Sequence, residues 1–171
     1  SFDDLSVKNS AKALFYFALG LPAFSFIKIF SSFLFARHNT KVPFYFSVIS
    51  VIINIIISIY YFNKIGFIII PMATTISSWL NAILLLIYLT NKKYYSINSI
   101  FLYSLIKISL STAITSYIFY NLINFFSDNL SYNSEYKLVS IILLVIVTFI
   151  IYILTSILTK AFKISDIKLK Y

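Results

Sequence analysis

Five long apolar stretches, separated by short polar ones, set the pattern of this chain. They cover residues 13–35, 43–62, 66–90, 101–126 and 138–159. Each approaches or exceeds the roughly 20 residues that a helix needs to cross the hydrocarbon core of a bilayer. Strands of a membrane barrel would be shorter and would alternate apolar with polar residues, and this chain has no such alternation. The pattern therefore predicts five transmembrane helices and an all-α integral membrane protein.

The polar connections between the apolar stretches are short. They cover residues 37–42, 63–65, 91–100 and 127–137. Thr40 is expected to cap the second helix, with Pro43 in its first turn, where a missing N–H costs nothing. Pro22 and Pro71 lie inside apolar stretches, and each is expected to kink its helix because proline removes one backbone hydrogen bond.

Composition supports a membrane protein and excludes other classes. The 171 residues are 60% hydrophobic and 11% charged, with a mean hydropathy of +0.92, whereas soluble domains average about 25% charged residues. The absence of cysteine excludes disulfides and thiolate metal sites. The net charge of +9 does not indicate a nucleic-acid partner, because the basic residues lie mainly between or beside apolar stretches instead of forming one patch.

The basic residues instead predict orientation in the membrane. One side holds Arg37, Lys41, Lys92, Lys93, Lys160, Lys163, Lys168 and Lys170. The other side holds Lys8, Lys12, Lys64 and Lys137. The positive-inside rule then predicts a cytoplasmic C-terminus, with Ser1 outside. Because the polar start at Ser1 is neither a Met nor a signal peptide, we expect Ser1 to be an internal point of a longer protein.

Lys28 lies in the middle of the first apolar stretch. A cation at that depth costs about 3 kcal/mol on insertion scales, so such residues usually face a protein interior or a water-filled cavity. The alternative is snorkelling to the headgroups near Arg37, roughly 13 Å away along a helix. Lys107 lies near the start of its stretch and is expected to snorkel.

Two blocks of sequence carry a family resemblance. The first contains Gly20-Leu21-Pro22-Ala23, Ile27-Lys28, Phe35-Ala36-Arg37 and Thr40-Lys41-Val42-Pro43. The second is the small-residue run Ala73–Ala82, ending Trp79-Leu80-Asn81-Ala82, with Asn54 between the blocks. Together they resemble the MurJ/MviN lipid II flippases of the MOP flippase superfamily. The chain departs from the family pattern at Ser31-Ser32, Asn39 and Ile69, where a small residue with Pro, an Asp and a Gly are common.

The resemblance implies a fold and a role. The chain is similar to the last five of fourteen helices in a two-lobe transporter, so a missing N-terminal lobe of the same protein is an expected partner. The implied function is to move undecaprenyl-linked peptidoglycan precursor, lipid II, across the bacterial inner membrane by alternating access, without a cofactor. The implied segments are a periplasmic stretch 1–12, three spans in 13–90, a cytoplasmic loop 91–100, two spans in 101–159 and a cytoplasmic basic tail 160–171.

Three polar residues inside the spans are candidates for substrate contact. Lys28 could supply positive charge to a cavity that shelters a diphosphate headgroup, and Asn54 and Asn81 are amides that could touch substrate. Hydrogen bonding between helices is the alternative role of both amides. The resemblance also implies that the last two helices build an apolar groove for the lipid tail, with plain lipid-facing packing as the alternative.

The sequence shows no pattern of an enzyme. All five acids lie in loops or tails: Asp3, Asp4, Asp128, Glu135 and Asp166. No proton relay within the spans is therefore visible, and His38 has no partners nearby that would form a metal site. Two other functions stay open. One is a related exporter of the superfamily, carrying a polysaccharide lipid or a drug, and the other is a small membrane protein that acts by binding partner helices.

Overall fold

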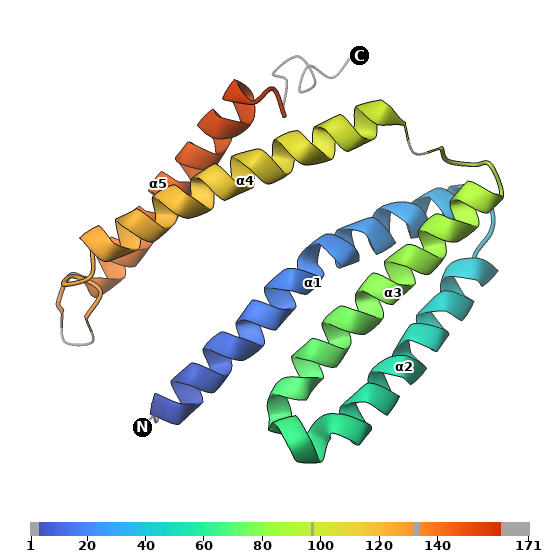
Figure 1. The fold of residues 1–171 in the computed structure, drawn as a ribbon, viewed down its shortest axis with the longest axis horizontal. Coiled ribbons are helices and arrows are strands. Elements are labelled where there is room, and N and C mark those ends of the chain that lie inside the picture. Colours follow the sequence, from blue (N-terminus) through green and yellow to red (C-terminus); the bar gives the residue numbers. More distant parts are fainter. Residues whose placement is uncertain (1–3, 97, 132–133, 162–171) are drawn as a thin grey trace. The chain divides into compact units, whose positions relative to one another are not determined.

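The computed structural model describes residues 4–96, 98–131 and 134–161 (Figure 1). It contains the α-helices α1 (Asp4–Ala36), α2 (Lys41–Ile65), α3 (Ile69–Asn91), α4 (Ser99–Phe125) and α5 (Lys137–Leu158), and a 3₁₀ turn, η1 (Gly66–Ile68). No strand occurs in the described ranges, which confirms the predicted all-α class. Four stretches are long and apolar enough to cross a membrane, one of which, Lys41–Asn91, runs through both α2 and α3.

The chain divides into two compact units, Ser1–Ser96 and Ile97–Tyr171. In the first unit α3 lies between α1 and α2 and packs against both, whereas α1 and α2 hardly touch (Figure 1). A small apolar core of Leu34, Leu85 and Leu89 closes the end of this unit at which α1 and α3 stop. In the second unit α4 and α5 pack against each other.

The starts of α1 and α2 differ from the sequence-based expectation. Helix α1 begins at Asp4, well before the apolar stretch, because hydropathy marks the membrane-embedded part of a helix and not its whole length. Thr40 occupies the N-cap position of α2 but makes no side-chain cap hydrogen bond. The backbone N–H of Val42 instead donates to Oδ1 of Asn39 at 3.3 Å. Asn39 therefore caps α2, one residue earlier than predicted.

The expected kink at Pro71 is absent, whereas Pro22 is a true interior proline. Pro71 falls in the first turn of α3, where N–H groups have no partner within the helix anyway. The chain reaches it through Gly66, whose φ of 73° ends α2 and whose N–H donates to the carbonyl of Phe62. Pro22 lies well inside α1, and α1 bends partway along its length (Figure 1).

Helices α1, α3 and α5 end with the same backbone motif. The residues His38, Lys93 and Lys160 have φ values of 56°, 56° and 54°. At the end of α1, the N–H of His38 donates to Phe35 O at 2.9 Å and the N–H of Asn39 donates to Leu34 O at 2.9 Å. This is the Schellman arrangement, which satisfies the last helical carbonyls and favours glycine at the left-handed position. A basic residue takes that position in all three motifs.

The strained position at His38 gives a test of this fold. His38→Gly should raise the free energy of unfolding by about 1 kcal/mol, because glycine adopts positive φ without a steric penalty. His38→Ala keeps the penalty and should leave stability within about 0.5 kcal/mol of the parent. Unfolding of the detergent-solubilised protein measures both changes. A glycine variant no more stable than the alanine variant would contradict the assigned helix end.

Candidate functional site

The polar face of α3 hydrogen-bonds to the backbone of α1. Thr75 donates its hydroxyl to the carbonyl of Tyr16 at 2.6 Å, and the indole N–H of Trp79 donates to the carbonyl of Leu19 at 3.1 Å. Leu19 lies in the turn before Pro22, and Tyr16 lies about one turn further toward the N-terminus of α1. Side chains of α3 thus donate directly to backbone carbonyls of α1 on the N-terminal side of Pro22.

Small residues let α1 and α3 approach closely at this point. Gly20 is buried, and a Cβ built there would lie 3.1 Å from Oγ1 of Thr75. Ala23 and Ala73 are fully buried. The small residues of the motif Gly20-Leu21-Pro22-Ala23 therefore serve a helix contact, because they let α3 approach.

Asn54 joins α2 to α3. Its Nδ2 lies 3.1 Å from Oγ1 of Thr74 and 3.3 Å from Oγ of Ser77, and its Oδ1 lies 3.5 Å from the hydroxyl of Ser58. The predicted interhelical hydrogen bonding of Asn54 is confirmed. All its polar atoms face other side chains of the described unit, so substrate contact by Asn54 stays a prediction.

Asn81 makes a second polar link between the same helices. It is 6% exposed, and its Nδ2 donates to Oγ of Ser47 on α2 at 3.4 Å. Its Oδ1 is buried and has no hydrogen-bond partner among the described residues. The interhelical hydrogen bond of Asn81 is thus confirmed, and its Oδ1 remains an unpaired acceptor among the described residues.

Lys28 differs from the two amides because it is exposed on α1. Its ammonium makes no hydrogen bond or ion pair with any residue that the structure describes. It is therefore not part of the interior of the first unit. The predicted cavity position of Lys28 depends on surroundings other than these helices.

The motif around Arg37 holds the ends of α1 and α3 together. The Arg37 guanidinium lies 4.2 Å from the ring centre of Tyr94 and 5.0 Å from that of Phe33. Nearby, Nδ2 of Asn39 donates to the hydroxyl of Tyr88 at 3.2 Å. An Asp at position 39, as is common in the family, could not donate this bond. Arg37 and Asn39 thus help to pack the end of α1 against the end of α3.

In the second unit, hydroxyl pairs join α4 to α5. The hydroxyl oxygens of Ser111 and Thr159 lie 2.7 Å apart, and those of Thr115 and Thr155 lie 3.1 Å apart. Each pair is one helical turn from the next, so the pairs fix the register of the two helices. Sequence reasoning described these helices as mostly apolar and missed the pairs, although their i, i+4 spacing is visible in the sequence.

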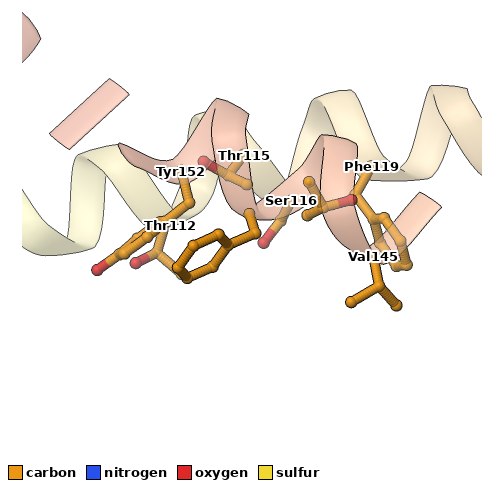
Figure 2. Close-up of a pocket in the computed structure, with 8 residues that line it drawn as sticks. Thr112, Thr115, Ser116, Phe119, Val145 and Tyr152 are labelled. Atoms are coloured by element: carbon orange, nitrogen blue, oxygen red, sulfur yellow. The ribbon is translucent and has the colours of Figure 1, made fainter. Parts of the chain in front are cut away.

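A pocket of about 420 Å³ opens beside these pairs (Figure 2). Its lining residues are Thr112, Thr115, Ser116, Phe119, Val145, Thr148, Phe149 and Tyr152. The hydroxyls of Thr112 and Thr148 donate hydrogen bonds to the carbonyls of Ile108 and Leu144 on their own helices. The pocket therefore offers methyl groups and rings more than free donors, and it suits an apolar guest.

Comparison with known protein families supplies the assignment. Residues 1–141 match the family model described as "Lipid II flippase MurJ". The chain belongs to this family. As a member of the MurJ family with helices of spanning length, it is a multi-pass membrane protein.

Curated relatives in three bacteria carry the name "Probable lipid II flippase MurJ". The protein of Rickettsia prowazekii is 35% identical over 91 residues, which are 53% of this chain and 18% of the relative. That of Rhizobium meliloti is 39% identical over 69 residues, which are 40% of this chain and 13% of the relative. That of Buchnera aphidicola is 32% identical over 99 residues, which are 56% of this chain and 19% of the relative. The chain thus spans less than a fifth of each relative. No solved structure gave a significant match.

The Asn54 link can be tested by its effect on stability. Asn54→Ala should lower the free energy of unfolding by about 1 kcal/mol, because it removes hydrogen bonds between α2 and α3. Asn121→Ala is the matched control: Asn121 lies on a spanning helix, but its amide donates to Tyr117 O of the same helix. Unfolding in mixed micelles measures both. Equal losses would show that the Asn54 bonds contribute nothing specific.

Proposed function

We propose that this chain is the C-terminal part of a lipid II flippase, which moves undecaprenyl-linked peptidoglycan precursor across the bacterial inner membrane. The family match over residues 1–141 carries the proposal. Transport by alternating access moves the substrate between sides of the membrane and changes no covalent bond in it. The protein is therefore a transporter, and its other lobe lies in a preceding part of a longer polypeptide.

The two units would have different tasks in this transport. The exposed Lys28 on α1 would face the cavity between the lobes and offer charge to the diphosphate of the headgroup. The pocket between α4 and α5, with its ring and methyl lining, would accept part of the lipid tail. Asn54 and Asn81 would hold the shape of the first unit and contact substrate only where their hydrogen bonds open.

The role of Lys28 is tested by flipping of labelled lipid II in liposomes that contain the full-length protein. Lys28→Leu should insert normally and flip about tenfold more slowly, because it removes a charge-assisted hydrogen bond worth about 1.5–3 kcal/mol. Lys28→Arg should keep part of the activity. Lys12→Leu, on the same helix but at its polar end, should flip normally. Wild-type flipping by Lys28→Leu would exclude the cavity role.

The proposed orientation places the C-terminus in the cytoplasm. These 171 residues contain no cysteine, so single cysteines at Asn129 and at Asn91 give unambiguous labels once any cysteine elsewhere in the longer polypeptide is replaced. Cysteine at position 129 should react with a membrane-impermeant thiol reagent in intact cells, and cysteine at position 91 should react only after permeabilisation. The opposite pattern would reverse the orientation that the basic residues predict.

A further inference from the structure

A pocket of about 580 Å³ lies in the first unit where α1 ends and α2 begins. Its lining residues are Ser31, Phe35, Thr40, Lys41, Pro43, Phe44, Tyr45 and Ser47. One ammonium, several hydroxyls and several aromatic rings thus surround one space. The rings of Phe44 and Tyr45 are 63% and 59% exposed, so they offer apolar surface to an incoming molecule.

The hydroxyls of this pocket are free to donate. Ser31, Thr40 and Tyr45 make no side-chain hydrogen bond with any residue that the structure describes. Ser47 accepts a bond from Asn81, which leaves its own proton available. Ser25 and Ser50 on the same helices, by contrast, donate to the carbonyls of Leu21 and Phe46 one turn back. A group of unsatisfied donors around one space suits an oxyanion.

The charge of the pocket also lacks a partner. The sequence has no Asp or Glu between Asp4 and Asp128, and Asp4 lies at the opposite end of the long helix α1. The Lys41 ammonium makes no ion pair or hydrogen bond within the described residues. Arg37, by contrast, is stacked on two rings. Lys41 is exposed and unpaired within the described residues, so its charge is available to an anion from outside this part of the chain.

The position of the pocket indicates which kind of molecule supplies that anion. It lies where two apolar stretches meet their polar connection, which is the depth of the lipid headgroups. The positive end of the α2 dipole points toward the same region. We propose that this pocket binds the headgroup phosphate of one acidic phospholipid of the bilayer. Lys41 pairs with the phosphate, the hydroxyls bind its oxygens, and Phe35 and Phe44 contact the acyl chains.

This proposal requires only that the chain spans a membrane, and it does not depend on lipid II transport. The test is native mass spectrometry of the purified full-length protein in neutral detergent, titrated with phosphatidylglycerol or phosphatidylcholine. The parent should bind one phosphatidylglycerol at least tenfold more tightly than phosphatidylcholine. Lys41→Gln should weaken that binding about fivefold, the usual effect of one basic residue at an anionic surface.

Two further variants distinguish binding in this pocket from a general attraction of anionic lipid to positive charge. Lys92→Gln removes one charge at the same end of the unit but outside the pocket, and it should change affinity less than twofold. Ser31→Phe keeps every charge but fills the pocket, and it should abolish the preference for phosphatidylglycerol. Equal weakening by Lys41→Gln and Lys92→Gln, or full binding by Ser31→Phe, would overturn the proposal.

Competition identifies the source of the phosphate. Millimolar inorganic phosphate should not displace the bound phosphatidylglycerol, because it lacks acyl chains for the aromatic wall. Undecaprenyl diphosphate carries a single branched polyprenyl chain in place of two acyl chains, so it should not compete at equal concentration either. Displacement by either compound would overturn the assignment to a bilayer lipid, and it would leave the flipping tests of Lys28 unaffected.

Discussion

The close approach of α3 to both of its neighbours is the contact on which the first unit depends. Between membrane helices no hydrophobic force favours association, because lipid tails are as apolar as leucine. Packing and hydrogen bonds must supply the stability instead. The buried small residues of α3 (Ala73, Ser77, Ser78 and Ala82) provide the packing, and on α1 Gly20 lies against Thr75 of α3. A larger residue at Gly20 would collide with Thr75 and separate the helices.

Close approach also explains why the spans contain so many small polar residues. A hydroxyl in a spanning helix can donate a hydrogen bond to a carbonyl one turn back, so its burial in lipid costs little free energy. Once two helices are near, the same hydroxyl can link them, as Thr115 and Thr155 do between α4 and α5. The amide of Asn54 makes a stronger link because it carries two donors and an acceptor. The polar residues of both units are thus largely the means of helix assembly.

Sequence alone predicted the helices well and their contacts poorly. Hydropathy locates α2 to α5 to within three residues at each end because lipid imposes a minimum apolar length. It misplaced the start of α1 because residues outside the bilayer can continue a helix without being apolar. It also put the cap at Thr40, since Asn39 and Thr40 have the same capping chemistry and only backbone geometry distinguishes them. The Trp79 and Thr75 bonds to α1 depend on which faces meet, which no single-helix pattern specifies.

The basic residues differ in their depth in the bilayer and in the groups that can contact them. Arg37 and Lys64 lie near helix ends and rest on aromatic rings, with Nζ of Lys64 5.5 Å from the ring centre of Tyr60. Lys28 and Lys41 have neither a ring nor an acid within the described residues. Lys41 sits at headgroup depth, where the bilayer itself provides phosphate. Lys28 lies roughly 13 Å deeper than Arg37 along the helix, where no bilayer headgroup is found. Lys28 must therefore either extend its side chain toward the headgroups or meet an anion from another part of the protein. Under the two proposals above, Lys41 would bind a bilayer lipid at headgroup depth, and Lys28 would offer its charge to the substrate at the deeper position.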